Sequence, residues 1–207
     1  MRVVALEGVN GAGKSSVAES IRNAYVAAGR ACITLDPAGR GRVGRVLRPR
    51  FVDAGTSVAP DLDSVFFAAL RAEGALSLLE DGSLTTDCTV VLERWSLALA
   101  AYGAADQADP SLVRELRAML DRTLAADITV LLDCPGATAF QRSAVSGTRN
   151  RFEARGARYL DAVAAAYRRN ALTGDVVVVD ASQDEHSTFA SVRAALATKW
   201  PELTFLG

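Results

Sequence analysis

The sequence predicts an α/β protein in which a five-stranded parallel sheet is flanked by helices on both faces. Five short apolar runs, most of them β-branched, recur along the chain, and longer segments with helical spacing separate them. A glycine-rich turn joins the first run to the first helical segment. The 207 residues, 50% of them apolar and 23% charged, suffice for one packed domain and are too few for two ordinary ones. We therefore expect residues 1–207 to form a single domain.

The expected elements alternate regularly along the chain. The apolar runs predict strands at residues 3–6, 32–35, 89–92, 128–132 and 176–179. Helical periodicity predicts helices at residues 15–28, 62–79, 111–124, 152–169 and 187–199. Helices that connect parallel strands place ligands at the carboxyl ends of the strands. The glycine- and arginine-rich segment 38–50 is the least regular region, and its arginines are expected to be mobile.

Composition excludes several classes of function. A formal net charge of −1 argues against broad electrostatic binding of nucleic acid, which needs a surplus of basic residues on one surface. No apolar run approaches the roughly 20 residues of a membrane span, so we expect a soluble, cytoplasmic protein without membrane partners. The three cysteines are far apart and His186 is the single histidine, which argues against a structural zinc site.

The turn between the first strand and the first helix carries the strongest functional signal. Residues 8–15 read Gly-Val-Asn-Gly-Ala-Gly-Lys-Ser, which fits the P-loop pattern of Gly, four residues, Gly, Lys and then Ser or Thr. Backbone amides in such a turn, together with the helix N-terminus, converge on phosphate oxygens. We expect Lys14 to reach the β- and γ-phosphates of ATP and the Ser15 hydroxyl to bind Mg²⁺. The expected nucleotide-binding residues are Gly8, Asn10, Gly11, Ala12, Gly13, Lys14, Ser15 and Ser16.

Charged residues follow the second and third expected strands, where a second substrate would bind. Asp36 ends the second strand, and Arg40 lies in the basic segment that comes next. The third strand ends in Glu93 and Arg94, and an arginine there can hold a phosphate through two hydrogen bonds. Taken singly, each segment also fits a solvated loop or an ordinary strand end.

Two further segments can complete the site. Phe67 and Arg71 lie four residues apart on an expected helix and so share one face, where they can stack on a base and bind its edge. The alternative is a core phenylalanine flanked by a solvated arginine. Farther on, Arg142, Arg149 and Arg151 surround residues 146–148. We interpret residues near 142–152 either as a lid that closes on the transferred phosphate or as a basic surface loop.

These segments occur in the same order as in thymidylate kinases, and from residue 1 to about 169 the chain resembles that family. The resemblance is carried by residues 6–15, 36–39, Phe67 with Arg71, 93–95, 101–102 and 149–153. It implies a fold of the P-loop kinase type, ATP and Mg²⁺ as cofactors, and a small-molecule nucleotide acceptor. Members of the family often form homodimers through paired helices, so a homodimer is also expected.

The resemblance also implies roles for individual residues. Phe67 would stack on the acceptor base, Arg71 would contact its edge, and Arg94 would hold the acceptor phosphate. Asn10 would lie near the sugar and Tyr102 close to the deoxyribose. Arg149 or Arg151 would act from the lid, because Ala12 supplies no arginine from the loop. Lys14 and Arg94 would be catalytic, and Asp36 and Arg40 would line the acceptor side. Glu93 would join Ser15 at the metal.

The chain departs from the family pattern at several positions, and these departures leave the acceptor open. The family usually has an acid at the Asn10 position, Asp at Glu93, an acid or Asn at Leu70, Asp at Asn150, Ser at Ala98 and a polar residue at Gly103. The prediction is phosphoryl transfer to a nucleoside monophosphate, with dTMP as the leading acceptor. A monophosphate brings ionised oxygens, so no protein base is needed.

Two other functions fit the same sequence. A deoxynucleoside or other small-molecule kinase would use Asp36 as the base that deprotonates a hydroxyl, and residues 93–94 also resemble the Glu-Arg pair of deoxynucleoside kinases. A nucleotide-dependent switch or degenerate binding protein is the non-enzymatic alternative. Retention of Lys14 and Ser15 counts against it, and the chain contains no Asn-Lys-x-Asp motif for guanine.

Overall fold

Five parallel strands form the centre of the molecule in a computed structural model that describes residues 1–53, 55–82, 84–145, 150–172 and 174–203. The strands are β1 (Arg2–Glu7), β2 (Cys32–Leu35), β3 (Thr89–Glu93), β4 (Ile128–Asp133) and β5 (Val176–Asp180). They are ordered β2-β3-β1-β4-β5, and every neighbouring pair is parallel. The predicted fold class and all five predicted strands are confirmed.

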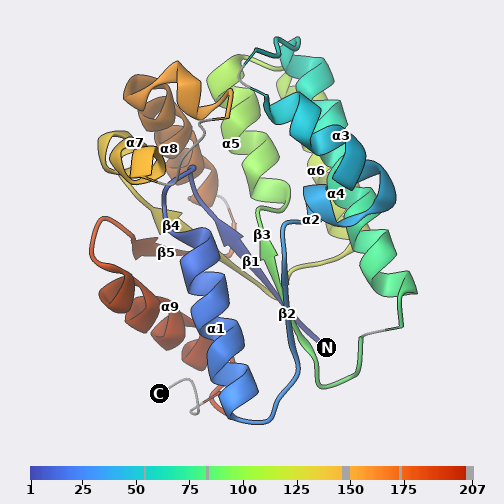
Figure 1. Ribbon diagram of the computed structural model, residues 1–207, viewed down its shortest axis with the longest axis vertical. Coiled ribbons are helices and arrows are strands. Elements are labelled where there is room, and N and C mark those ends of the chain that lie inside the picture. The colour runs from blue at the N-terminus through green and yellow to red at the C-terminus, as the bar shows by residue number, and fades with distance from the viewer. Residues whose placement is uncertain (54, 83, 146–149, 173, 204–207) are drawn as a thin grey trace.

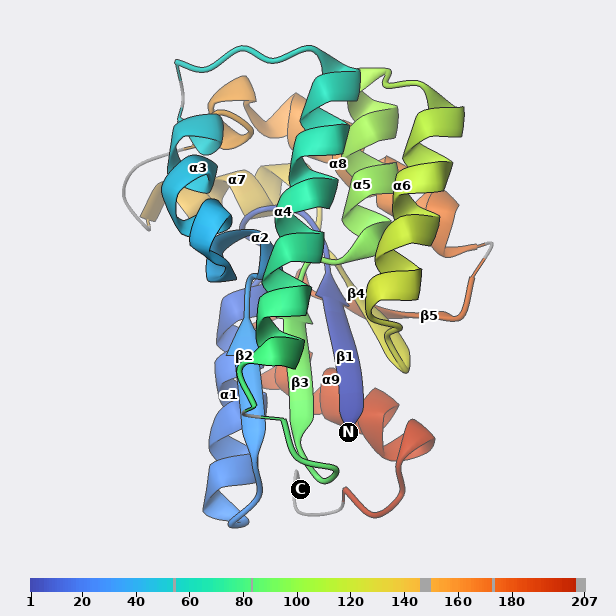
Figure 2. The same cartoon turned by 90° about the vertical axis from the view of Figure 1, so that its right-hand side faces the viewer.

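Helices cover both faces of this sheet, with α1 and α9 on one side and α4 and α6 on the other (Figures 1 and 2). The helices are α1 (Lys14–Ala27), α2 (Pro37–Arg40), α3 (Arg42–Val52), α4 (Pro60–Glu80), α5 (Ser96–Asp106), α6 (Pro110–Thr123), α7 (Gly136–Val145), α8 (Ala157–Ala171) and α9 (Glu185–Lys199), with the short 3₁₀ helix η1 (Glu153–Arg155) before α8. Among the described residues, no helix is both long and apolar enough to cross a membrane.

Two sequence predictions need correction, and two helices were not predicted. Segment 38–50, interpreted as irregular, forms most of α2 and α3. Helices α5 and α7 have no counterpart among the predicted elements. The helix predicted at residues 152–169 is interrupted, because Gly156, with φ 84°, separates η1 from α8.

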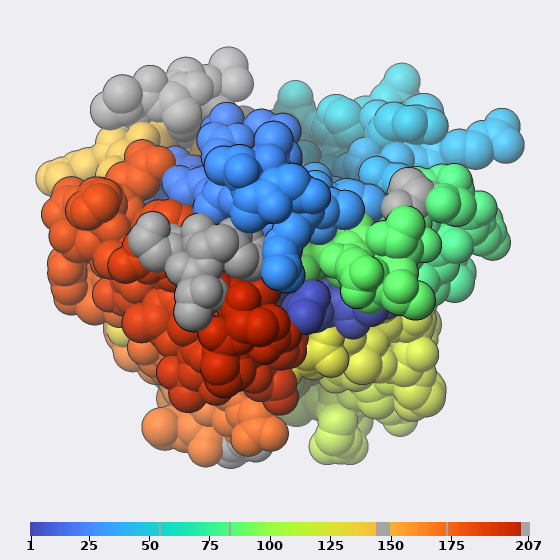
Figure 3. Space-filling model, turned by 90° about the horizontal axis from the view of Figure 1, so that it is seen from below, coloured from blue at the N-terminus to red at the C-terminus, as the bar shows by residue number. Residues whose placement is uncertain are grey.

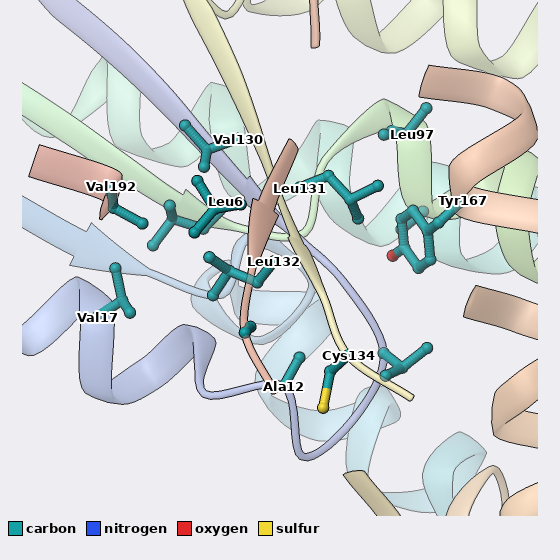
Figure 4. Close-up of a cluster of buried hydrophobic side chains, with 14 of the residues drawn as sticks. Leu6, Ala12, Val17, Leu97, Val130, Leu131, Leu132, Cys134, Tyr167 and Val192 are labelled. Carbon is teal, nitrogen blue, oxygen red and sulfur yellow. The ribbon is translucent and has the colours of Figure 1, made fainter. Parts of the chain in front are cut away.

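The central strand β1 divides the core into two hydrophobic clusters. Val4 and Leu6 point to the cluster formed with α1, α8 and α9, while Val3 and Ala5 point to the cluster formed with α4, α5 and α6. This alternation follows from the two-residue period of a strand. Figure 4 shows the first cluster, where Leu6 and Leu132 meet Val17 from α1 and Val192 from α9.

The strand ends define two opposite faces of the molecule. The N-terminus of the chain lies at the amino ends, together with α9 and the end of α1 (Figure 3). At the carboxyl ends, β1, β2 and β3 each lead directly into residues that the sequence marked as functional: the P-loop after Glu7, Asp36 after Leu35, and Arg94 after Glu93. The fold therefore brings these three segments to the same edge of the sheet.

Candidate active site

The P-loop forms a tight turn between β1 and α1, as the sequence predicts. Its three glycines all have positive φ, and Gly13 occupies the left-handed region at the start of α1. Gly11 is also closely packed, because a Cβ atom there would lie 2.0 Å from the carbonyl oxygen of Ala139. Only glycine fits this position without displacing the backbone of α7.

Lys14 lies inside the turn, with 5% of its surface exposed. Its Nζ donates hydrogen bonds to the carbonyl oxygens of Gly8 at 2.9 Å and Val9 at 2.6 Å. Burial lowers the pKa of Lys14 well below its usual value; the positive charge of Arg94 adds to this effect and the Glu93 carboxylate opposes it. The lysine is thus held beside the glycine-rich backbone that would receive phosphate.

Ser15 and Glu93 bring two hard oxygen donors together beside this turn. The Ser15 Oγ donates a hydrogen bond of 2.5 Å to the Glu93 carboxylate. A hydroxyl with one carboxylate fits Mg²⁺, which takes few protein ligands and completes its shell with water and phosphate oxygens. Within the described residues, no group of three or more His, Cys, Asp or Glu side chains forms a denser metal site. Ser15 and Glu93 therefore remain the candidate metal ligands.

A cavity of about 480 Å³ extends from the P-loop to the acceptor side. Most of the side chains predicted from the sequence line it, together with groups from α3, α4, α5 and α7. The predicted residues on its wall are Asn10, Gly11, Gly13, Lys14, Ser15, Ser16, Asp36, Phe67, Arg71, Arg94 and Tyr102.

Arg94 lines this cavity and has an unusual backbone conformation. It is one of two non-glycine residues with positive φ in the described chain, at 68°, and its amide donates to the Leu6 carbonyl at 2.9 Å. The guanidinium donates to Oδ1 of Asn10, which also accepts a hydrogen bond from the Tyr102 hydroxyl at 3.3 Å. Nδ2 of Asn10 donates to Glu153 at 3.0 Å. The Asn10 amide therefore connects Arg94 with the segment that follows the predicted lid.

Phe67 and Arg71 share one face of α4, as their spacing predicts. The Cζ of Arg71 lies 5.6 Å from the centre of the Phe67 ring, and Arg71 is only 5% exposed. Its Nε and Nη1 are buried and have no hydrogen-bond partner among the described atoms. Buried donors without partners are rare in folded proteins, so these two are suited to acceptor atoms of a ligand.

Glu7 is a residue whose importance the sequence analysis missed. It is completely buried at the end of β1 and accepts hydrogen bonds from the amides of Trp95 at 2.8 Å and Ala98 at 3.3 Å and from the Tyr167 hydroxyl at 3.1 Å. Burial raises the pKa of this carboxyl group, whereas the positive charges of Arg71 and Arg94 lower it. The available signal was an acid directly before the first P-loop glycine. A glutamate buried at the end of a strand usually has a positively charged partner, so its presence there indicates basic residues close by.

Asp36 lies on the cavity wall, but both of its oxygens have partners. Oδ1 accepts from the Ala38 amide at 3.1 Å and so caps α2, while Oδ2 accepts from Arg48 at 2.6 Å. Arg48 also lines the cavity and was missed. No local signal singled it out, because its direction depends on how α3 packs.

Arg40, predicted to bind substrate, does not line the cavity. The helical turn of α2 directs it instead to Asp81 at the end of α4, with which it forms an ion pair. Gly8 and Ala12 also lie behind the wall, as parts of the turn itself. The geometry thus favours Arg48 over Arg40 as the basic residue that this segment contributes.

The predicted lid divides into parts with different surroundings. Arg149 and residues 146–148 lie outside the described residues, so the prediction for Arg149 stays open. Arg142, in α7, lines the cavity and donates to the carbonyl oxygens of Ala181 at 2.7 Å, Ser182 at 3.0 Å and Gln183 at 2.7 Å. Arg151 does not line the cavity; it forms an ion pair with Asp63.

Comparison with known proteins identifies the family. The family model described as thymidylate kinase matches residues 6–192. The thymidylate kinase of Leifsonia xyli is 30% identical over 196 residues, covering 93% of both chains. The thymidylate kinase of Bradyrhizobium diazoefficiens is 27% identical over 202 residues, which cover 94% of this chain and 88% of the relative. That of Rhodopirellula baltica is 29% identical over 167 residues, which cover 80% of this chain and 67% of the relative. With its P-loop, its acceptor-side cavity and this match over nearly its whole length, the chain belongs to the thymidylate kinase family.

Proposed function

We propose that this chain transfers the γ-phosphoryl group of ATP to dTMP, giving ADP and dTDP, in a Mg²⁺-dependent reaction. One observation carries the proposal: a single cavity joins the P-loop lysine and serine to the arginine, phenylalanine and tyrosine predicted to hold a nucleotide acceptor. The relatives named above, each described as thymidylate kinase, support the choice of dTMP.

The side chains of the cavity account for the chemistry by alignment and charge. Lys14 and the loop amides bind the phosphates of ATP, while Arg94 holds the acceptor phosphate in line with them. Mg²⁺ at Ser15 and Glu93, when bound, supplies neutralisation of the phosphate charge. The acceptor phosphate is already ionised near neutral pH, so the chain needs no general base. Its positive groups stabilise the charge that develops during transfer.

The surroundings of Asp36 support a monophosphate acceptor over a nucleoside. A general base needs a free oxygen directed at the hydroxyl that it deprotonates. In this chain one Asp36 oxygen caps α2 and the other accepts a hydrogen bond from Arg48. Arg48 balances the Asp36 charge and, because it also lines the cavity, offers further N–H donors on the acceptor side, which suits a substrate that carries its own phosphate.

The test is ADP release by the purified protein with ATP and Mg²⁺, with dTMP, dUMP, dCMP, dAMP, dGMP and thymidine supplied separately. We expect turnover with dTMP and none with thymidine. The Lys14→Met variant is the matched control, because it removes the phosphate-binding charge and keeps an unbranched chain of similar length. Turnover with thymidine alone would transfer the assignment to a nucleoside kinase, and no turnover with any acceptor would exclude the proposed reaction.

Two properties of the whole protein belong to the same proposal. We propose a cytoplasmic location, and a homodimer through paired helices is what the family resemblance implies. Sedimentation of the purified chain measures the second directly, and a mass of one chain at micromolar concentration would contradict it.

A further inference from the structure

Arg151, in the part of the predicted lid that the structure describes, is attached to the acceptor side of the cavity. The Arg151 amide donates to the carbonyl oxygen of Val52, at the end of α3, at 2.9 Å. Its guanidinium forms an ion pair with Asp63 in the first turn of α4. Arg151 is thus bound through its backbone to one helix of the acceptor side and through its side chain to another.

This ion pair is well shielded from water. Only 11% of the Arg151 side chain and 10% of the Asp63 side chain are exposed. Burial raises the pKa of Asp63, and the charge of Arg151 and its hydrogen bond oppose that rise. Exposed ion pairs contribute little to stability, but loss of one partner from a shielded pair leaves an uncompensated charge. The position of the segment therefore depends strongly on both partners.

Arg151 also lies against the two aromatic rings that face the acceptor. Its Cζ is 4.2 Å from the centre of the Phe152 ring and 5.9 Å from that of Phe67, and the two rings lie 5.8 Å apart. Phe67, Phe152 and Asp63 line the cavity, whereas Arg151 lies behind them. Its influence on a ligand must pass through these three side chains.

We propose that Arg151 is a positioning residue for the acceptor base, acting through its ion pair with Asp63, which holds Phe152 opposite Phe67. The inference rests on the proposed phosphoryl transfer to a nucleoside monophosphate and extends it. It replaces the sequence-based prediction that Arg151 acts on the transferred phosphate from the lid. Asn150 and Glu153, on the same segment, connect the base side to the phosphate side, because Glu153 accepts hydrogen bonds from both Asn10 and the Asn150 amide.

The two roles predict different kinetics for the same variants. Loss of a phosphate-binding arginine would lower kcat and kcat/KM together, whereas loss of a base-positioning residue raises the KM for the acceptor. In Arg151→Gln and in Asp63→Asn we expect the KM for dTMP to rise about tenfold, with kcat within roughly twofold and the KM for ATP unchanged. Arg151→Lys keeps the charge and should recover part of the acceptor affinity.

A double variant and a matched control separate positioning from general loss of structure. Asp63→Asn with Arg151→Gln places two neutral, hydrogen-bonding side chains at the pair, so its effect should be smaller than the product of the two single effects. Arg168→Gln breaks the more exposed ion pair with Asp133, whose side chains are 48% and 25% exposed, and should leave every kinetic constant unchanged. Circular dichroism checks that each variant is folded.

Calorimetric titration of dTMP without ATP distinguishes failure of this inference from failure of the proposed function. Weakened dTMP binding in the single variants, with partial recovery in Arg151→Lys, supports the inference even if the wild-type protein shows no turnover. A fall in kcat at unchanged acceptor KM, or unchanged dTMP affinity in all variants, overturns it. Additive effects in the double variant would overturn the role of the ion pair.

Discussion

Glu7 and the two arginines near it show how single residues of this site depend on one another. The carboxylate fixes the backbone at Trp95 and Ala98, and so the start of α5, directly after Arg94. Burial lowers the pKa of Arg71, and the negative charge of Glu7 opposes this by favouring the protonated guanidinium group. Burial also acts to lower the pKa of Arg94, but nearby groups that include Glu7 raise it above its usual value. A buried acid of this kind stabilises the arginines that would bind an anionic acceptor, while its own charge is disfavoured by burial.

Glu7→Gln is expected to flatten the pH dependence of stability. Because the pKa of Glu7 is raised in the folded state from its ordinary value of 4.5, the folded state binds more protons than the unfolded state between these two values. Its contribution is therefore fully present below pH 4.5 and is lost as the pH rises through the raised pKa. Glutamine keeps the hydrogen-bonding shape without the charge, so the variant should gain stability relative to wild type as the pH rises from the ordinary pKa to the raised one. The gain should be about 1.4 kcal/mol for each pH unit that separates the two pKa values.

Urea unfolding at a series of pH values measures this difference. Glu19→Gln, which changes an exposed glutamate of α1, is the matched control and should follow the wild-type curve. A constant difference between Glu7→Gln and wild type across the whole range would show that the burial of Glu7 does not perturb its ionisation.

At the scale of elements, α4 supports the segment that was hardest to predict. The α2 backbone lies directly on Gly74, where a Cβ atom would be 1.9 Å from the carbonyl oxygen of Pro37. Next to it, the Glu73 carboxylate accepts hydrogen bonds from the amides of Val43 at 3.2 Å and Gly44 at 3.3 Å, in the first turn of α3. One turn of α4 thus fixes the position of α2 and satisfies the free amides at the start of α3.

Gly74→Ala is expected to destabilise the protein although alanine favours helices. The gain in helix propensity is about 1 kcal/mol, but the methyl group would push the α2 backbone away and cost roughly 1–3 kcal/mol beyond that gain. Because α2 is capped by Asp36, the displacement should also raise the KM for the acceptor. Thermal unfolding and steady-state kinetics measure the two effects.

Gly39→Ala is the control for this variant, since the nearest atom to its added Cβ would be Cδ of the Arg48 side chain, 3.4 Å away. It should be close to neutral in stability. Equal stability of both variants would show that α2 is not held by its contact with Gly74.

The elements that the sequence did not reveal share a dependence on tertiary contacts. Helix α5 is buried on nearly all sides from Ser96 to Ala101, so it lacks the apolar stripe from which helical periodicity is recognised. Helix α3 contains Gly44 and Pro49, both unfavourable inside helices, and relies on Glu73 for its first amides. The five strands and the P-loop could be predicted because local apolar runs and residue spacing determine them.

The candidate site was predictable to the same extent. Phe67 with Arg71 follows from spacing within one helix, and Lys14 with Ser15 from a contiguous motif. The choice of Arg48 over Arg40 depends on which way α2 and α3 turn, and that is decided by packing against α4. The partner of Arg151 lies 88 residues away and leaves no local signal in the sequence.

At the scale of the whole molecule, β1 contributes side chains to both hydrophobic clusters and so joins the two faces of the sheet. Leu6 belongs to the cluster on the α1 side and Leu92, in β3, to the cluster on the α4 side, and both are completely buried. Since β1 contributes to both clusters, we expect them to unfold together as one domain.

Leu6→Ala and Leu92→Ala test this expectation. Each should cost about 2–5 kcal/mol, and each should lower the midpoint of a single transition in urea. Tryptophan fluorescence, which reports on Trp95 and Trp200, and far-ultraviolet circular dichroism should give coincident curves. Two separate transitions in either variant would show that the faces of the sheet are independent units.

The left-handed backbone of Arg94 sets stability and function against each other at that position. Any side chain other than glycine, asparagine or aspartate is disfavoured at positive φ, so the chain retains arginine there at an energetic cost. Selection for a more stable protein alone would favour glycine at residue 94 and would remove the guanidinium that we propose to hold the acceptor phosphate. Variants selected for thermostability alone should therefore include substitutions of Arg94, whereas variants selected for activity as well should retain it.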